Sequence, residues 1–330
     1  MSRAFQRIKG SNGLPDDLRN GVVAIGNFDG VHRGHQSVLQ RALDIGRAKG
    51  EPVLALVFEP HPRSFFRPQE PIFRLTPAPM RATLLEAFGL DGVVELAFTR
   101  DVAATEPEDF VSRILVADLG VRDVVTGYDF HFGRARRGDP AFLSAAGVGA
   151  GFGVSTVEAF DDEGGGAVSS TRIRSLLSAG EPAEAAALLG YRFTLEAEVG
   201  RGKQLGRTLG FPTANMALSD SVDLQHGIYA VRFRRADGSL HDGVASFGRR
   251  PTVEEGGAVL LETFLFDFDG DLYGETGRVS FFGFLRPELK FDGLAALTAQ
   301  MRQDEAEARA LLAGVSPLSL LDAKIAFAAR

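Results

Sequence analysis

The sequence predicts an α/β domain with a parallel sheet, followed by an all-β domain. Up to about residue 180, short apolar runs alternate with helix-period segments, a pattern typical of parallel sheets with right-handed crossovers. After about residue 190, strand patterns follow one another, separated by Gly, Asp and Pro turns. The length of 330 residues is enough for two domains of ordinary size.

The first half begins with a strand, a helix and a second strand, which together form a βαβ unit. The helix is indicated by Val38, Leu39 and Ala42, which recur at helical spacing. The predicted elements are strand 21–26, helix 36–48, strand 52–58, helix 80–88, strand 92–96, helix 107–115 and strand 123–126. This succession indicates an open, Rossmann-like sheet.

The second half shows the alternation of short strands that predicts an antiparallel barrel or sandwich, and we favour the barrel. Its predicted strands are 192–199, 228–234, 242–246, 260–268 and 278–282. A helix over 294–312 closes the domain, and a further short helix is expected after Pro317. A short connecting helix within 180–191 sets the expected boundary, giving domains 1–187 and 188–330.

The composition argues against several classes of protein. A formal charge of −7 disfavours broad binding to nucleic acid or to an anionic membrane, because clustered cations hold polyanions. The absence of Cys excludes disulfides, thiolate nucleophiles and Cys-ligated metals. No apolar segment of a secretion signal follows the first ten residues, so we expect a cytoplasmic protein that acts on small molecules. Nothing in the sequence indicates oligomerisation.

Two histidines mark the junction between the first strand and the first helix. Residues 26–36 read GNFDGVHRGHQ, which places His32 and His35 on one face of the start of a helix. Parallel sheets bind ligands at the carboxyl ends of their strands, and helix N-termini attract phosphate. The Gly-rich turn favours a phosphate site; a metal site or simple helix capping are the alternatives.

A second anion-binding segment is expected at residues 168–174, which read VSSTRIR. Ser170 and Thr171 suit the start of a helix, and Arg172 or Arg174 could offer a guanidinium fork to phosphate. A well-capped surface helix is the alternative interpretation.

The start of the β half carries a Gly-rich and cationic segment. Residues 200–216 read GRGKQLGRTLGFPTANM, which does not have the spacing of a Walker A motif. A hairpin tip with solvated charges is the alternative to a phosphate-binding loop.

The motifs of the first half resemble those of the nucleotidylyltransferase superfamily, and the whole chain resembles bacterial bifunctional riboflavin kinase/FAD synthetases. The resemblance rests on the H-x-G-H and S-S-T-x-x-R segments together with FEPHPRSFF, RLTP and GYDFHFGRARRGD. It implies that FMN attacks ATP and releases pyrophosphate. It implies catalytic roles for His32, His35 and Arg174; binding of ATP by Gly26, Asn27, Phe28, Gly34, Ser170 and Thr171; and flavin contacts by His61, Gly127, Asp129 and Phe130.

The second half resembles riboflavin kinases, from GRTLGFPTAN through HGIYAV, GRRPT, LETFLFDF, DLYG and FLRPELKF. The resemblance implies that Glu262 is the general base and that Thr213 and Asn215 bind Mg²⁺ with ATP. It also assigns ATP phosphate contacts to Gly202, Lys203 and Gly206, and a flavin contact to Arg286. Riboflavin, FMN, FAD and ATP are the implied small-molecule partners.

Two departures from the riboflavin kinase pattern concern the flavin side more than the reaction. This chain has Ser246-Phe247-Gly248 where many relatives have Asn-Ile-Gly, and Phe264 where they have His. The competing functions are an enzyme with only one working site and a flavin-binding regulator without turnover.

Overall fold

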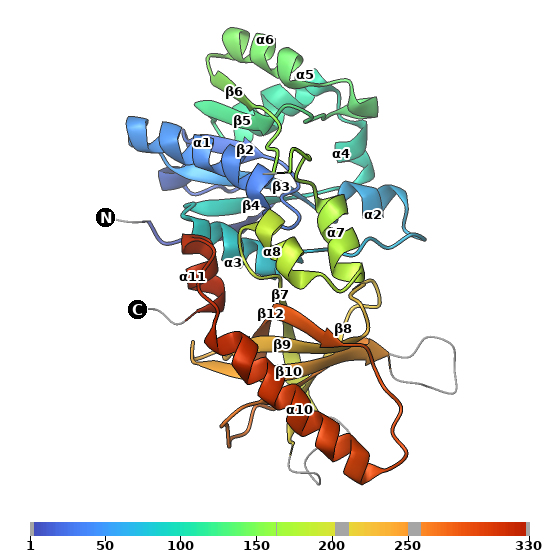
Figure 1. Ribbon diagram of the computed structural model, residues 1–330. Coiled ribbons are helices and arrows are strands. Elements are labelled where there is room, and N and C mark those ends of the chain that lie inside the picture. The colour runs from blue at the N-terminus through green and yellow to red at the C-terminus, as the bar shows by residue number, and fades with distance from the viewer. Residues whose placement is uncertain (1–2, 163, 202–210, 250–258, 328–330) are drawn as a thin grey trace. The chain divides into compact units, whose positions relative to one another are not determined.

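The computed structural model describes residues 3–162, 164–201, 211–249 and 259–327. The chain separates into two compact units (Figure 1). The first unit comprises residues 1–72 and 76–169, and the second comprises residues 73–75 and 170–330.

The first unit is built on a parallel sheet, which confirms the predicted α/β fold. Within the described residues the strand order is β1-β4-β3-β2-β5-β6, and every neighbouring pair is parallel. The strands are β1 (Gln6–Lys9), β2 (Val22–Ile25), β3 (Val53–Glu59), β4 (Gly92–Ala97), β5 (Asp123–Gly127) and β6 (Gly153–Val157). The order reverses between β2 and β5, which creates a topological switch point.

Helices cover the sheet because successive strand residues point to opposite faces, and both faces are apolar. Val23 and Ile25 belong to a core cluster that includes η2 and α6, whereas Val22 lies near Gly46 of α1. The helical segments are η1 (Asp16–Leu18), α1 (Arg33–Lys49), α2 (Pro62–Phe66), α3 (Ala78–Phe88), α4 (Arg100–Ala104), α5 (Pro107–Asp109), the π-helical η2 (Phe110–Asp118), η3 (Arg134–Arg136) and α6 (Pro140–Ala150).

The second unit contains a closed antiparallel barrel, which confirms the predicted all-β half. In the described part of the chain its strand order is β10-β11-β8-β7-β12-β9. The strands are β7 (Thr194–Gly200), β8 (Thr213–Leu218), β9 (Gly227–Arg234), β10 (Leu240–Arg249), β11 (Val259–Leu265) and β12 (Thr276–Arg286). The long helix α10 (Leu294–Ala313) packs across β9, β10 and β12, as Figure 1 shows.

Among the described residues, the second unit also contains the helices α7 (Ser170–Ser178), α8 (Pro182–Leu189) and α11 (Leu320–Ala326). The helix expected after Pro317 is confirmed as α11, which three arginines hold against the barrel. Arg234 donates to the carbonyls of Lys324, Ile325 and Phe327, and Arg232 donates to the carbonyl of Ala326. Asp322 pairs with the guanidinium of Arg192, the third of these arginines. The second compact unit takes up the chain again at residue 170, while domains 1–187 and 188–330 as functional halves stay a prediction.

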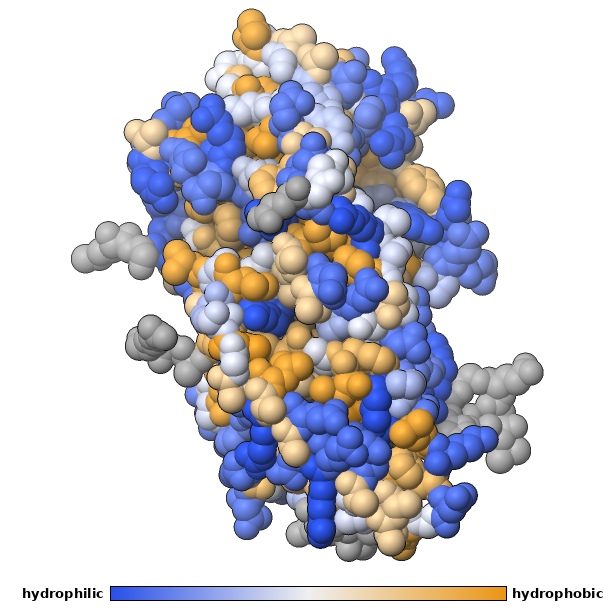
Figure 2. Space-filling model, viewed as in Figure 1, coloured by the Kyte–Doolittle hydropathy of each residue, from blue (hydrophilic) through white to orange (hydrophobic). Residues whose placement is uncertain are grey.

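The described helices include none that is long and apolar enough to cross a membrane. Figure 2 shows hydrophilic residues over much of the visible face of each unit. Large apolar side chains that are exposed come from several elements of both units, among them Phe66, Val148 and Leu320.

Candidate active sites

The turn after β2 brings His32 and His35 together at the start of α1. His32 is the N-cap of α1, and its Nδ1 accepts a hydrogen bond from the backbone N–H of His35 at 3.3 Å. The two imidazoles stack with their centroids 3.6 Å apart. The predicted shared face is therefore present, and a histidine supplies the cap where Ser or Asp is more usual.

The environment of His35 keeps its imidazole neutral. Burial lowers the pKa of His35 well below its ordinary value, and the positive charge that His32 can carry lowers it further. Its Nδ1 is buried and has no hydrogen-bond partner among the residues that the structure describes. A neutral imidazole has one N–H to donate, so this side chain can reach a ligand oxygen without carrying a full charge.

The backbone of the turn that precedes His32 is strained. Phe28 and Val31 have φ angles of 49° and 37°, a region that side chains other than glycine rarely adopt. Phe28 is almost fully buried and meets His35 edge to face at 5.4 Å. A Cβ on Gly26 would lie 3.1 Å from the Phe28 ring, a tight contact, so the glycine leaves room for this ring.

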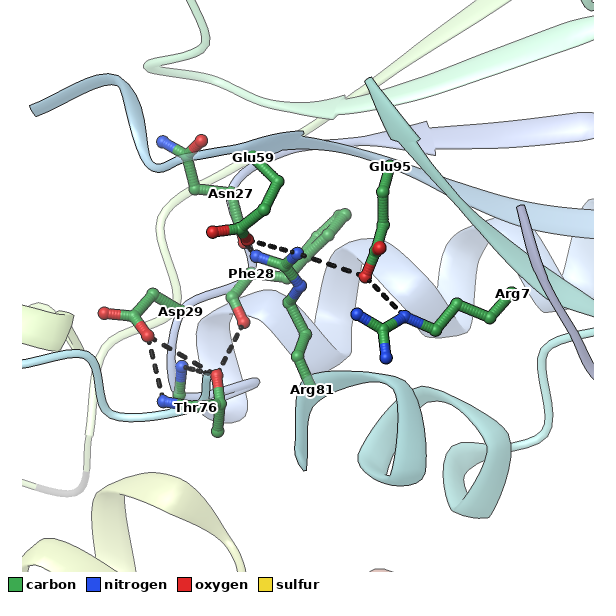
Figure 3. A network of polar contacts seen from close by, with 9 residues as sticks. Arg7, Asn27, Phe28, Asp29, Glu59, Thr76, Arg81 and Glu95 are labelled. Atoms are coloured by element: carbon green, nitrogen blue, oxygen red, sulfur yellow. Dashed lines mark hydrogen bonds and ion pairs between the residues drawn. The ribbon is translucent and has the colours of Figure 1, made fainter. Parts of the chain in front are cut away.

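A polar network that includes Thr76 and Arg81 stabilises this turn (Figure 3). The Thr76 hydroxyl accepts from the Gly30 N–H at 2.7 Å, and Asp29 Oδ1 accepts from the Thr76 N–H at 3.0 Å. Arg81 donates to the Asn27 carbonyl at 3.3 Å and to Glu59 at 3.0 Å. The turn is therefore tied to the segment that starts α3.

The predicted residues Asn27 and Gly34 lie in the same loop and helix start. Asn27 Oδ1 is buried and, within the described part of the chain, has no hydrogen-bond partner, so it can accept from a ligand. Gly34 lies close under the His32 ring, since a Cβ on it would be 3.3 Å from that ring. Both positions lie at the carboxyl end of β2, beside the switch point.

The expected flavin contacts of the first unit follow the neighbouring strands β3 and β5. His61 caps α2, with its Nδ1 accepting from the Arg63 N–H at 3.1 Å. Gly127 ends β5, and its carbonyl accepts from the Phe130 N–H in the turn that carries Asp129. Phe130 stacks on Phe132 at 5.5 Å. Since parallel strands end at one edge, these loops border the edge that carries His35.

Ser170, Thr171 and Arg174 all lie on α7, which starts at Ser170 as the motif predicted. Arg174 Nε donates to the carbonyl of Phe73 at 2.6 Å, a bond within the second unit. Arg172 lies on the same helix. This segment belongs to the second unit, whereas His32 and His35 belong to the first, so their joint action stays a prediction.

The second site is a row of side chains across three antiparallel strands. Register places Glu262 of β11 directly between Asn215 of β8 and Ser246 of β10. Directly opposite residues point to the same face, and Thr213 shares that face because it lies two residues from Asn215. The Asn215 amide donates to Thr213 Oγ1 at 3.2 Å. Glu262, Asn215 and Thr213 are therefore brought together, as predicted.

Arg286, the predicted flavin contact of the barrel, ends β12 and pairs with a carboxylate of α10. Its Nε and Nη2 donate to Asp304 at 2.7 and 2.6 Å, and its guanidinium lies 5.9 Å from the Phe291 ring centre. Asp304 is buried. The predicted phosphate contacts Gly202, Lys203 and Gly206 lie outside the described residues.

Sequence reasoning missed the side chains that hold these sites in place, notably Thr76, Arg81 and Asp304. Thr76 lies inside the RLTP segment, but its partner Asp29 is 47 residues away. Arg81 and Asp304 are charged residues of predicted helices, and the structure shows both to be buried. A charged residue on the apolar face of a predicted helix is the available signal.

The fold and the two groups of polar side chains define a two-part nucleotide-dependent transferase. A family model described as FAD synthetase matches residues 14–172, and one described as riboflavin kinase matches residues 189–312. The chain belongs to the family of bifunctional riboflavin kinase/FMN adenylyltransferases. It uses ATP to convert riboflavin to FMN and FMN to FAD, which confirms the predicted function.

The similarity to curated relatives spans both halves. The bifunctional enzyme of Pseudomonas fluorescens is 42% identical over 94% of this chain and 98% of its own length. That of Escherichia coli K12 is 39% identical over 92% and 96%. A crystal structure named macrolide-efflux protein, from Streptococcus pneumoniae, superposes with a TM-score of 0.80 at 29% identity, covering 92% of this chain and 98% of that one.

Proposed function

We propose that FMN adenylylation takes place at the turn of Asn27, His32 and His35, and that riboflavin phosphorylation takes place at the row of Glu262, Asn215 and Thr213. The observation that carries the proposal is that each group of residues converges on one edge or one face of its own unit. The FAD synthetase and riboflavin kinase matches fall on the same two parts of the chain.

In the adenylylation, a phosphate oxygen of FMN attacks the α-phosphorus of ATP. The new P–O bond forms as the bond to the bridging oxygen breaks, and pyrophosphate leaves with that electron pair. FMN phosphate is already ionised, so no side chain has to remove a proton. His32, His35 and the N–H groups at the start of α1 would orient the phosphates and stabilise the developing charge.

Two other groups belong to the same assignment. The FAD synthetase match extends to residue 172, which supports assigning Ser170 and Thr171 to this activity. Arg174, two residues beyond the match, is assigned with them on the resemblance alone. Gly26, Phe28 and Gly34 would shape the ATP turn, while His61, Gly127, Asp129 and Phe130 would border FMN. Phe65 and Phe66 lie on α2, the helix that His61 caps, and their rings pack edge to face at 5.3 Å. They would offer an apolar surface to the flavin.

In the phosphorylation, the 5′-hydroxyl of riboflavin attacks the γ-phosphorus of ATP and ADP leaves. The 5′-hydroxyl must lose its proton in this step, and Glu262 would accept that proton as the new P–O bond forms. A positioned general base contributes about 10²–10⁴-fold to such a step. We also assign Gly202, Lys203 and Gly206 to the phosphates and Arg286 to the flavin, on the resemblance alone.

The oxygens of Thr213 and Asn215 fit a magnesium ion that arrives with ATP. Mg²⁺ prefers oxygen ligands and takes only one or two from the protein, with phosphates and water completing its shell. In this structure the Asn215 amide nitrogen, and not its oxygen, faces Thr213, so the amide has to turn before both oxygens can bind one ion. When bound, the ion would neutralise phosphate charge. Among the described residues no group of three or more His, Asp or Glu could hold a metal ion.

We propose small molecules as the working partners, in the cytoplasm, where ATP is supplied. We do not expect nucleic acid to be a partner, because the formal charge of −7 disfavours binding to a polyanion. The two activities of the family, and not macrolide efflux, are the function that we propose, because the bifunctional relatives are similar to this chain over more than nine-tenths of this chain's length.

Incubation of the purified protein with riboflavin, ATP and Mg²⁺, followed by chromatography over time, tests the proposal. FAD that appears after transient FMN is the expected result. Accumulation of FMN alone would confine activity to the barrel. Tight flavin binding without turnover would indicate a regulator.

A further inference from the structure

The strained turn that carries Asn27 and Phe28 depends on support from outside itself. The left-handed φ angles of Phe28 and Val31 cost free energy, so surrounding contacts have to stabilise the conformation of the turn. The contacts come from one segment that is distant in sequence. Thr76 binds the Gly30 N–H at 2.7 Å, and Arg81, five residues further along, binds the Asn27 carbonyl at 3.3 Å.

Arg81 also contacts the neighbouring strand β3. Its Nη2 donates to Glu59 at 3.0 Å, and Glu59 is the last residue of β3, two residues before His61. The same nitrogen lies 3.8 Å from Glu95 of β4. One guanidinium, 0% exposed, therefore connects the loop assigned to ATP with the loop assigned to FMN, as Figure 3 shows for its carboxylate partners.

The geometry suits the fork of an arginine. Arg offers donors in a rigid plane, so it can bind a carbonyl on one side and a carboxylate on the other without rotating. The surrounding low dielectric strengthens both contacts. Arg7 supplies a second positive charge to Glu95, which it binds at 2.8 Å. It contacts neither of the two loops.

We propose that Arg81 is a positioning residue of the adenylyltransferase, which sets the ATP turn and the FMN loop relative to each other. Thr76 acts on the ATP turn alone. The inference rests on the proposed assignment of these two loops to ATP and FMN. It predicts that Arg81 variants impair the use of both substrates, whereas Thr76 variants impair only the use of ATP.

The experiment measures KM for ATP, KM for FMN and kcat of FAD formation in the full-length enzyme. Arg81→Met should raise both KM values and lower kcat/KM by about 10²-fold, the effect of misplacing reactants by about 1 Å. Arg81→Lys keeps the charge beside Glu59 and Glu95 but lacks the fork, so about a tenfold loss is expected. Thr76→Val should raise only KM for ATP, and Glu59→Gln only KM for FMN.

Arg7→Met is the matched control, since it removes a cation from the same network without touching either loop. It should leave all three constants unchanged, and riboflavin kinase activity should be unchanged in every variant. If Arg81→Met does not fold by circular dichroism, Arg81→Lys and Glu59→Gln decide. Normal KM values for both substrates in Arg81→Lys would overturn the inference. So would a loss of kcat/KM in Arg7→Met as large as that in Arg81→Met.

The same measurements separate this inference from the site assignment. Loss of FAD formation in His35→Gln together with normal kinetics in the Arg81 variants would reject the positioning role only. Normal FAD formation in His35→Gln would show that the ATP site lies elsewhere, and the site assignment would then fail.

Discussion

The two candidate sites use opposite means to gather polar groups. In the first unit, a tight turn and a helix start bring together residues that are close in sequence, such as His32 and His35. In the barrel, strand register brings together residues that are far apart, such as Asn215 and Glu262. The first arrangement offers N–H groups to an anion, and the second offers carboxylate and amide oxygens.

The difference matches the chemistry of the two nucleophiles. The phosphate of FMN attacks as an anion, so its site needs donors and alignment. The hydroxyl of riboflavin must lose a proton, so its site needs a base, which we propose is Glu262. Experiments that exchange or remove these groups should therefore affect one activity and spare the other.

The largest expected effect is on the kinase. Glu262→Gln keeps the shape of the side chain but removes the base, so FMN formation should fall by about 10²–10⁴-fold. Conversion of supplied FMN to FAD should stay at the wild-type rate. Both rates are measured by chromatography, with the exposed strand carboxylate variant Glu198→Gln as the control. Loss of both activities in a folded protein would contradict the two-site comparison.

The next largest effect is expected in the first unit. His35→Gln should lower FAD formation by about 10²–10³-fold, the usual cost of removing one donor to a developing charge. FMN formation should continue unchanged, which reverses the pattern of Glu262→Gln. Arg41→Gln, on an exposed position of α1, should behave as wild type.

A smaller effect is expected from the oxygen ligands proposed for magnesium. Thr213→Val preserves volume and removes one oxygen, and a contact to a charged group is worth about 1.5–3 kcal/mol, so half-saturation by Mg²⁺ should rise at least about tenfold. The measurement is the Mg²⁺ dependence of FMN formation. An identical shift in FAD formation would show that Thr213 does not act through the kinase site.

The smallest effect concerns the protonation of His35. Because its folded pKa is lowered below the unfolded value of about 6.5, its contribution to stability is fully present above that pH. The contribution is lost as the pH falls below about 6.5, with a slope of at most about 1.4 kcal/mol per pH unit.

The pKa of His35 can be read from NMR of the imidazole protons. The chain has six His, and His35 is assigned by the signal that His35→Gln removes. A titration midpoint at or above 6.5 in the free enzyme would contradict the neutral state inferred for the first site.

Much of the fold could be predicted from local pattern. The apolar period of α1, α3 and α10 and the apolar runs of β2 and β3 match the predicted ranges closely, because burial of one face selects these residues. The strand β1 was missed, since QRIK is short, has Ile8 as its one apolar residue, and becomes a strand only by pairing with β4. The strand β8 was likewise not predicted, because its TANMAL pattern depends on the neighbours β7 and β11.

The sequence by itself determined the two domain types, the helix start at His32 and His35, and the presence of Glu262 in a strand, because each depends on spacing within a few residues. Only the tertiary structure decided which distant residues meet. The barrel order set Glu262 against Asn215, and burial turned Arg81 from a helical charge into a link between two loops. Such contacts join residues 22 to 54 positions apart, and no local pattern specifies them.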